Sequence, residues 1–446
     1  MNKHHAAPQR MAPAGRRALL ASVVGTIIEW YDYALYGAAA ALVIGPLFFP
    51  NTLSSGATMA AFATFAVGFI VRPVGGVLIA HIGDRFGRKP AMILTIVLMG
   101  AATVMIGLLP TAETLGIWAP VLLVLFRMLQ GFGAGAELAG AMTVVAEFAP
   151  PRRRGFFTGV VLACPPAGTV LATLAFLAVS AMPTEDLLGG WWRAPFLASA
   201  VLFFLALFIR NRMEETPEFA AVAQRHAEAE KTKVPLAALL RHSWREVIIG
   251  FFAVTGHNAN HYILATFSLA FLTQQAGMSR SDALVAVLIA SICGAAASPF
   301  GGMLADRIGA ARTLAAGGLL GAAYAYPLFL ALQSGSLALA TAALVVGNAL
   351  VLALTAGAQG AFLTSLFPPK YRFSGVALSR EVNGAVVAGN TPLIATSLIA
   401  AANGGVQLAA GFLAVALLIT AAAALMGRRL SEQHLDAPTE AVPTTA

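Results

Sequence analysis

Apolar runs of about twenty residues, the length that crosses a bilayer as a helix, recur along the whole chain and alternate with short polar segments. Only helices and closed barrels satisfy their backbone hydrogen bonds in lipid, and these runs are too long and unbroken for barrel strands. The pattern therefore predicts an all-α membrane protein with twelve transmembrane helices. The predicted spans are residues 18–45, 57–81, 91–109, 117–147, 156–182, 191–209, 245–273, 281–304, 312–333, 337–366, 374–401 and 405–427.

The composition agrees with a membrane protein. Of the 446 residues, 58% are hydrophobic and 11% are charged, whereas about a quarter of the residues in a soluble domain are charged. The net charge of +8 comes from basic residues in the short loops, which is a topology signal and argues against a nucleic-acid partner. Cys164 and Cys293 lie inside apolar runs and are interpreted as buried thiols.

Basic residues gather before the first span and after every even-numbered span, while the opposite loops hold little beyond Arg280 and Arg193. The positive-inside rule then predicts a multi-pass protein of the cytoplasmic (inner) membrane with both termini in the cytoplasm. The basic N-terminal segment before an apolar run also fits a signal peptide. That run contains two acids and leads into more spans, so we interpret it as a retained first span.

The two halves of the chain echo each other. HIGDRFGRKP and LADRIGAARTL follow the second and eighth spans, with Asp84 and Asp306 222 positions apart. FAPPRRRGFFTG and LFPPKYRFSGVA follow the fourth and tenth spans, with Pro151 and Pro369 218 positions apart. Such a duplication predicts two pseudo-symmetric six-helix bundles with a binding site between them, which is a transporter architecture. The predicted division is an N-terminal six-helix bundle at 1–209, a cytoplasmic linker at 210–243, a C-terminal six-helix bundle at 244–427 and a cytoplasmic tail at 428–446.

Two acids, Glu29 and Asp32, lie within the first span, in GTIIEWYDYALYG. An ionisable side chain at the centre of a span costs about 2.5–3.5 kcal/mol, so those that persist mark candidate sites. Glu29 lies about 18 Å along the helix from Arg17, and the three-residue spacing places both acids on one helix face. Arg127, at a similar depth in the fourth span, is the expected counter-charge. A role in proton coupling is preferred over a purely structural ion pair.

Other charged residues within the spans have two interpretations each. Glu137, in QGFGAGAELAGA, either takes part in proton coupling or bonds to a neighbouring span. Arg72, just before Pro73, either holds an anionic substrate or caps helix ends. Arg380 and Glu381 are adjacent and point to different faces, which favours structural roles.

The motif HNANHY in the seventh span places His257 and His261 one turn apart. We expect polar side chains here and elsewhere near mid-membrane to contact the substrate. No third His, Cys or acid joins the two histidines in the motif, so no metal site is expected. No nucleophile–base pair appears either, so neither an enzyme nor a cofactor is predicted. The expected uncharged substrate contacts are Tyr33, Tyr36, His257, Asn258, His261, Tyr262 and Asn383.

Charged residues at the cytoplasmic ends of spans are expected to control opening. Asp84 is expected to face the positive N-terminal end of the eleventh span, and Asp306 is its counterpart in the second half. Arg88 is expected to pair with Glu147. Contacts of this kind would hold the cytoplasmic side shut and break on inward opening, which gives the two states different energies.

These motifs resemble a known family. GDRFGRK at 83–89 is similar to the loop motif of the major facilitator superfamily, with a weaker copy at Asp306. The metabolite:H+ symporter branch of that family includes permeases for α-ketoglutarate, citrate, shikimate and proline or betaine. The motifs that resemble this branch are GTIIEWYDYALYG, RPVGG at 72–76, RMLQGFGAGAELAGA at 127–141, EFAPPRRRGFF, WWRAPFL at 191–197 and EETPEF, and together they cover nearly the whole chain.

The resemblance implies a twelve-helix fold, alternating access and substrate uptake driven by the proton gradient. It implies a coupling carboxylate at Asp32 with its partner at Arg127, and anion-binding roles for Arg72 and Arg193. We expect Asp32, helped by Glu29, to bind a proton from the outside while Arg127 reorients, because a buried acid that parts from an arginine changes its affinity for protons. The expected substrate is a small carboxylate, to which Arg72, Arg127 and Arg193 would supply bidentate anion-binding groups. We expect it to be carried by a monomer surrounded by membrane lipid.

The chain also departs from the branch pattern. Gly135-Ala136-Glu137-Leu138 replaces the usual GGE followed by an aromatic residue, and Gly309-Ala310-Ala311 replaces a GRR-like run, which predicts a weaker second latch. The C-terminal tail is too short and proline-broken for the coiled coil that some proline/betaine relatives have.

Three alternative functions remain open. One is symport of a zwitterion such as proline or betaine. Another is H+-coupled drug efflux, which the Pro/Gly break ACPPAG at 163–168 loosely supports. A non-transporting sensor is disfavoured because the 210–243 segment and the tail are too small for a signalling domain.

Overall fold

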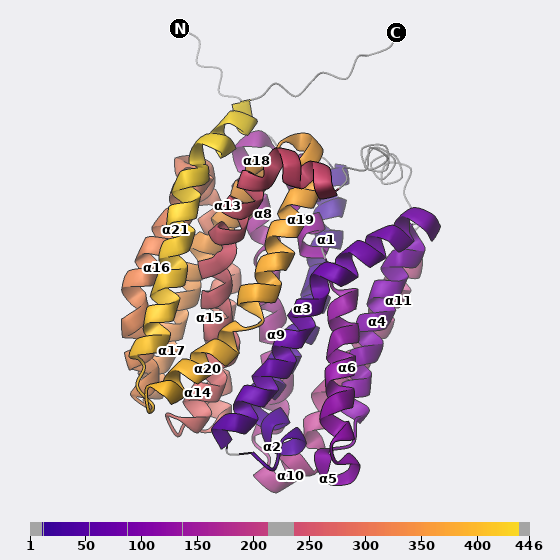
Figure 1. Cartoon of the computed structure of the whole chain (residues 1–446), viewed down its shortest axis with the longest axis vertical. Coiled ribbons are helices and arrows are strands. Elements are labelled where there is room, and N and C mark those ends of the chain that lie inside the picture. Colours follow the sequence, from indigo (N-terminus) through magenta and orange to yellow (C-terminus); the bar gives the residue numbers. More distant parts are fainter. Residues whose placement is uncertain are drawn as a thin grey trace.

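The described chain is almost entirely helical (Figure 1). The structure is a computed structural model that describes residues 11, 13–52, 54–86, 88–135, 137–212 and 236–436; the side chains at 14, 54, 80–81, 83–86, 88–92, 151, 205–212, 236–237 and 434–436 are not described. Within the described ranges, nine helices are long and apolar enough to cross a membrane, accompanied by the shorter apolar helices Ile93–Leu108 and Trp191–Phe204. The chain is therefore a multi-pass membrane protein.

The first half of the chain crosses the molecule six times, and several passes consist of consecutive helices. These passes are α1–η1–α2 (Pro13–Ala39, Ala40–Ile44, Gly45–Phe48), α3 (Ser54–Phe86), α4 (Arg88–Leu108), α6–α7 (Trp118–Gly133, Glu137–Phe148), α8–α9 (Arg154–Val161, Cys164–Ser180) and α11 (Ala194–Arg212). The short connecting helices are α5 (Ala112–Leu115), η2 (Pro151–Arg153), α10 (Thr184–Gly189) and η3 (Trp191–Arg193).

The second half repeats this arrangement. Its first pass bends at Ser243, whose φ of −134° is not helical, and its last helix continues to Asp436, beyond the predicted end of the twelfth span. The passes are α13–η4–α14 (Leu236–Tyr262, Ile263–Phe267, Ser268–Gln274), α15 (Arg280–Ile308), α16 (Ala310–Gln333), α17–η5–α18 (Leu337–Val346, Gly347–Leu352, Ala353–Leu366), α19–η7–α20 (Arg372–Asn383, Gly384–Ala388, Thr391–Ala401) and α21 (Gln407–Asp436), with η6 (Pro369–Tyr371) before α19.

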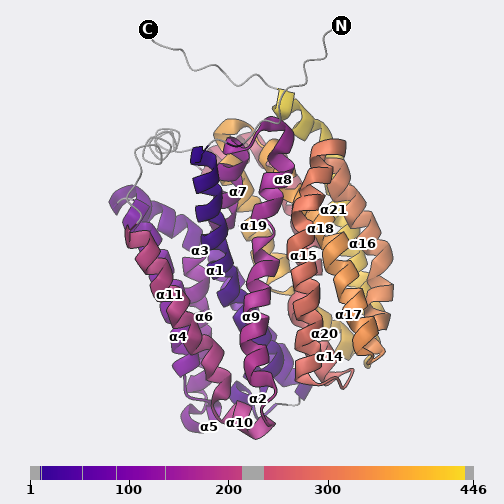
Figure 2. The same cartoon turned by 180° about the vertical axis from the view of Figure 1, so that it is seen from behind.

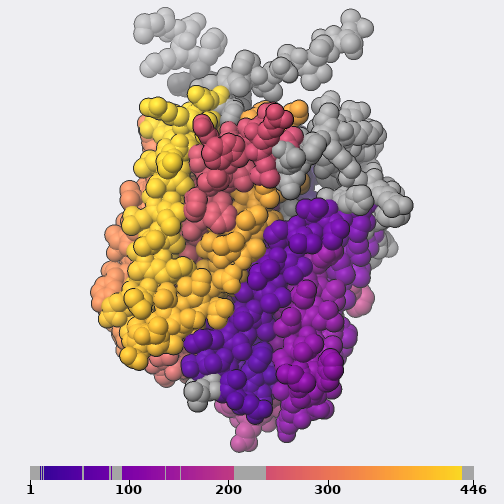
Figure 3. Space-filling model, in the orientation of Figure 1, coloured from indigo at the N-terminus to yellow at the C-terminus, as the bar shows by residue number. Residues whose placement is uncertain are grey.

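The two halves form two bundles that meet along a long seam (Figure 3). On one side of the molecule α15 packs against α8 and α9, and on the other α3 packs against η7 and α20 (Figures 1 and 2). The described chain begins with α1 and ends with α21 at the same end of the molecule (Figure 1). This arrangement matches the predicted fold of twelve helices in two six-helix bundles.

Several passes contain a π-helical turn, in which one extra residue per turn changes the direction of the side chains that follow. Two of these turns, η1 and η4, occur in the first pass of each half. Two more, η5 and η7, lie in the second half. Isolated π-helical turns within α-helices are frequent at functional sites, and η4 contributes to the central site described below.

The bundles approach most closely near the end where α1 begins. Gly155 in α8 and Gly302 in α15 come so close that a Cβ atom on Gly302 would lie 2.1 Å from the Gly155 carbonyl oxygen. Only glycine permits this approach of one backbone to another. The contact joins the two bundles and closes this end of the molecule.

Gly302→Ala should therefore open the closed end. The added methyl group cannot fit against Gly155 while the bundles are closed, so we expect greater labelling of cysteines placed along the seam at this end. Gly411→Ala is the matched control, because a Cβ atom there has nothing within 4 Å. Equal labelling in the two variants would contradict this account of the closure.

Candidate functional site

The structure is closed at both ends of the seam. At the end near the start of α1, Asp306 Oδ1 accepts a hydrogen bond from Gly155 N at 2.7 Å, and Oδ2 accepts one from Phe156 N at 2.9 Å. Asp306 thus caps the positive N-terminal end of α8 from the opposite bundle. At the other end, Thr58 donates to Gln274 Oε1 at 2.8 Å across the seam. The molecule is in an occluded state.

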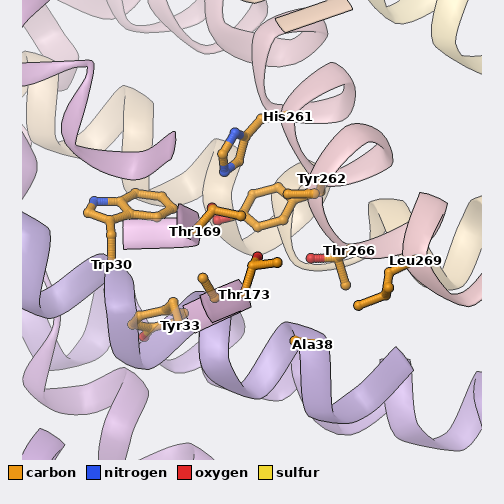
Figure 4. Close-up of a pocket in the computed structure, with 11 residues that line it drawn as sticks. Trp30, Tyr33, Ala38, Thr169, Thr173, His261, Tyr262, Thr266 and Leu269 are labelled. Carbon is orange, nitrogen blue, oxygen red and sulfur yellow. The ribbon is translucent and has the colours of Figure 1, made fainter. Parts of the chain in front are cut away.

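A small central cavity lies between the bundles (Figure 4). Its volume is about 10 Å³, which is room for about one water molecule. Any metabolite therefore requires the bundles to separate before it can bind. The first bundle contributes Trp30, Tyr33, Thr169 and Thr173, and the second contributes His261, Tyr262, Thr266 and Leu269 (Figure 4).

A buried ion-pair network crosses the seam beside this cavity. Arg72 on α3 donates from Nε to Glu381 Oε2 on α19 at 2.9 Å, and from Nη2 to Glu29 Oε1 on α1 at 3.2 Å. All three side chains are buried. The Arg72 guanidinium also lies 5.0 Å from the centre of the Tyr33 ring. One arginine thus holds two carboxylates from different bundles together at mid-membrane.

Arg127 on α6 does not form an ion pair with any acid in the described part of the chain. Its Nη1 donates to Gln130 Oε1, and its Nη2 donates to the Phe65 carbonyl oxygen at 3.1 Å. The guanidinium lies 4.0 Å from the centre of the Tyr36 ring, a favourable cation–π arrangement. Tyr33 lies between the two arginines, with its ring centre 5.4 Å from Arg127.

Four hydrogen-bond donors around the central cavity have no hydrogen-bond partner among the described residues. They are Trp30 Nε1, Tyr33 OH, Tyr262 OH and Arg72 Nη1, and all four atoms are buried. Most buried polar groups in proteins are satisfied, so unpaired ones need an explanation. A ligand rich in acceptor oxygens would satisfy them.

The expected direct pairing of Asp32 with Arg127 is wrong for this state of the molecule. Successive residues on an α-helix are about 100° apart, so Glu29 and Asp32 are offset by about 60° around α1. Glu29 reaches Arg72, whereas Asp32 faces Thr103 on α4, and Arg127 acts on it only through the longer-range electrostatic field.

Most of the uncharged contacts predicted in the second half hold that bundle together. His257 Nδ1 lies 3.1 Å from Thr355 Oγ1, and Asn258 Nδ2 donates to Asn383 Oδ1 at 2.6 Å. Asn383 also donates to Phe251 O and Thr255 Oγ1. Only His261 and Tyr262 of the predicted second-half set line the central cavity.

Of the two tyrosines predicted in the first half, one lines the central cavity and the other packs within its own bundle. Tyr33 lines the central cavity. Tyr36 instead has its hydroxyl 2.6 Å from Thr64 Oγ1 and its ring under Arg127.

Arg193 lies away from the central cavity, contrary to the expectation that it binds substrate. Its Nη1 donates to the carbonyl oxygens of Gly107 and Leu109, at 2.9 and 2.7 Å. The last carbonyls of a helix lack hydrogen-bond partners within the helix. Arg193 donates hydrogen bonds to such carbonyls at the end of α4. These hydrogen bonds give Arg193 a structural role that requires no substrate.

The predicted gating residues are only partly described. The side chains of Asp84 and Arg88 lie outside the described part of the chain. Glu147 on α7 lies within electrostatic range of Arg372 from the second half. Asp306 makes the helix-capping contact across the seam, and its gating role stays a prediction.

Some residues of the site were not predicted from the sequence. Glu381 was assigned a structural role, yet it meets Arg72 across 309 positions. Trp30 lies within the motif of the first span and lines the central cavity, but it is not among the residues predicted from the sequence. Thr169 and Thr173 lie one turn apart in α9. Two polar residues on one face of an apolar helix could have indicated a polar site there.

Comparison with known proteins identifies the family. A family model described as the Major Facilitator Superfamily matches residues 23–389. The chain belongs to the Major Facilitator Superfamily. It is therefore a membrane transporter and not an enzyme.

The relatives of this transporter agree with the predicted metabolite:H+ symporter branch. It is 38% identical over 412 residues to the Shikimate transporter of Escherichia coli K12, which covers 92% of this chain and 94% of the relative. It is 32% identical over 404 residues to the Citrate-proton symporter of Klebsiella pneumoniae, with 90% of each chain covered. The Proline/betaine transporter of Escherichia coli K12 is 32% identical over 391 residues, which cover 86% of this chain and 78% of the relative.

The fold also matches solved structures. The transporter superimposes on the xylose transporter XylE from E. coli, in a partially occluded inward-open conformation, with a TM-score of 0.67 and 16% identity. The match covers 95% of this chain and 98% of that chain. It confirms the twelve-helix, two-bundle fold.

Proposed function

We propose that this transporter imports a small carboxylate together with a proton by alternating access between its two bundles. It acts as a monomer in the inner membrane, with both termini in the cytoplasm. The observation that carries the proposal is the cluster of buried, unpartnered donors at the central cavity, beside a buried arginine. An anionic ligand would supply the hydrogen-bond acceptors that these donors lack.

Arg72 is the proposed anion-binding group. It reaches both bundles, and its guanidinium can hold a carboxylate through two parallel hydrogen bonds. In the occluded state Glu381 occupies that position, with Nε–Oε2 and Nη2–Oε1 distances of 2.9 and 3.5 Å. The substrate carboxylate would therefore displace an internal carboxylate of the same chemistry.

Glu29 is proposed to couple the proton to this exchange. Its Oε1 accepts from Arg72, while Oε2 has no hydrogen-bond partner among the described residues. A proton on Glu29 would neutralise its carboxylate and weaken its ion pair with Arg72, so that the guanidinium could bind the substrate. Loss of that proton would restore the pair and expel the substrate carboxylate. Asp32, three residues along α1, is proposed to receive the proton first.

The names of the relatives support the substrate class. Shikimate, citrate, proline and betaine differ in size and net charge, but each carries a carboxylate. The feature that they share is the group that Arg72 would bind.

The carboxylate requirement can be tested by ligand binding to the purified transporter. We would measure thermal stabilisation by shikimate, citrate, 2-oxoglutarate and betaine, because a ligand present at about 100 times its Kd stabilises the folded state by about 2.7 kcal/mol. The matched control for each carboxylate is its methyl ester. Stabilisation by an acid but not by its ester is expected; equal stabilisation by both would contradict an arginine-held anion.

A zwitterionic substrate is the second candidate. Glu29 and Glu381 lie beside the same arginine, so the site offers both an anion-binding and a cation-binding group. Stabilisation by betaine, together with none by shikimate or citrate, would favour this candidate.

A further inference from the structure

A second, larger cavity lies wholly within the first bundle. This side cavity has a volume of about 360 Å³ and is bounded by α1, α4, α7 and α11. It shares none of the second-bundle residues that line the central cavity. The substrate site and the side cavity are therefore separate spaces.

Helix α1 stands between the two cavities. Its residues Trp30, Tyr33 and Ala34 line the central cavity, whereas Ile28 and Asp32 line the side cavity. Glu29 lines the side cavity and accepts a hydrogen bond from Arg72, whose guanidinium lies beside the Tyr33 ring of the central cavity.

The side cavity runs from the cytoplasmic end of α1 to the middle of the bundle. Arg17 marks one end and Asp32 the other, about 22 Å apart along the helix. Near the Arg17 end the lining residues Leu20 and Val24 are 65% and 45% exposed. At the Asp32 end Asp32, Met99 and Ser199 are buried. Among the described residues, the cavity is therefore open near Arg17 and closed near Asp32.

Acidic side chains line an otherwise largely apolar wall. Glu29, Asp32 and Glu137 all face the side cavity, and a Cβ atom on Gly25 would lie 2.9 Å from Glu137 Oε1. Carboxylates surrounded by lipid chains are costly, and a space of this volume holds about a dozen water molecules at about 30 Å³ each. Water is the occupant that suits both the size and the acids.

We propose that the side cavity is a water-filled proton route from Asp32 and Glu29 to the cytoplasm that bypasses the substrate site. The inference rests on the proposed proton-coupled function and adds the order of events. Because the route is present while both ends of the seam are closed, the proton leaves first. Glu29 then forms its ion pair with Arg72 again, and the substrate carboxylate is released as the cytoplasmic end opens.

The charged groups around this route are consistent with proton transfer. Arg72, Glu137 and Glu381 lie within electrostatic range of Glu29, and Arg127 lies within electrostatic range of Asp32, which also hydrogen-bonds to the neutral side chain of Thr103. A proton would pass as hydronium or along hydrogen-bonded water, so no bond other than O–H forms or breaks and no oxidant or cofactor is needed.

Aqueous access can be tested with single cysteines. In a Cys164→Ser/Cys293→Ser background, Ser199→Cys places a thiol at the Asp32 end of the side cavity. Ser291→Cys is the control, because Ser291 is buried in α15 and does not line the cavity. We expect a membrane-impermeant thiosulfonate, applied to inside-out vesicles, to label Ser199→Cys and not Ser291→Cys. Labelling of Ser199→Cys by a lipid-soluble maleimide alone would overturn the proposal in favour of a lipid-filled space.

The route can also be blocked. Ala21→Trp would fill the side cavity, and Ala198→Trp is the matched control on an exposed surface of α11 outside it. With Ala21→Trp we expect proton-driven uptake of shikimate to slow by about tenfold, a barrier increase of about 1.4 kcal/mol, while exchange of labelled for unlabelled shikimate continues at the wild-type rate. Unchanged uptake would overturn the route. If wild-type uptake ignores the proton gradient, the proposed function has failed instead.

Discussion

Asp32→Asn is expected to abolish accumulation of the substrate against its gradient. Asparagine keeps the shape of the buried side chain and its position beside Thr103, but it cannot take up and release a proton. With one proton per substrate, one pH unit supplies about 1.4 kcal/mol, which is about tenfold accumulation in the wild-type transporter. The Asp32→Asn transporter should only equilibrate the substrate.

Substrate exchange is the internal control for Asp32→Asn. Exchange across proteoliposomes needs substrate binding and movement of the bundles, but no net proton transfer, so it should persist. Continued uphill uptake would show that Asp32 is not needed for coupling. Loss of uptake and exchange together would show that Asp32 serves the structure or the substrate site instead.

Arg72→Gln is expected to abolish uptake and also to destabilise the transporter. The change leaves Glu29 and Glu381 close together without the cation that joins them. Removing one partner from a buried ion-pair network costs about 3–5 kcal/mol. Thermal unfolding in detergent should show the loss of stability, and binding of labelled shikimate should be lost with it.

A double variant separates the two roles of Arg72. Arg72→Gln/Glu381→Gln removes the repulsion between Glu29 and Glu381 as well as the arginine, so part of the lost stability should recover, although Glu29 still lacks its counter-charge. Uptake and shikimate binding should not recover, because the anion-binding group is still missing. If the double variant regained uptake, Arg72 would be only a structural counter-charge, and the substrate carboxylate would have to bind elsewhere.

The overall fold was predictable because hydrophobicity along the chain is a local property. Each apolar run is long enough to cross the membrane once, and the basic loops predict an orientation without knowledge of any contact. The echo between Asp84 and Asp306 revealed the duplication in the same way, from residue types alone. The π-helical turns and the bend at Ser243 have no comparable local signal.

The pairing of charges within the membrane was harder to predict. The sequence indicated which side chains are buried in the bundles, but depth alone favoured Arg127 as the partner of the acids. The structure pairs Glu29 with Arg72, and Arg72 with Glu381 on the other bundle. Which face of each helix meets which neighbour depends on packing across more than 300 positions, as for the 309 between Arg72 and Glu381.

The role of Arg193 also could not be predicted from the sequence. A motif resemblance suggested an anion-binding arginine, whereas the structure uses its guanidinium to complete the end of α4. An arginine at the edge of a span can serve either role, and only the position of its neighbours decides between them.

The most direct test of the whole account is uptake in proteoliposomes with an acidic exterior. Labelled shikimate, citrate, 2-oxoglutarate and betaine would be offered with and without a protonophore, while an internal dye reports proton entry. The account predicts accumulation of at least one carboxylate, simultaneous proton entry, and loss of both when the protonophore is added. Accumulation that ignores the protonophore, or outward movement of a cationic drug with no carboxylate uptake, would contradict it.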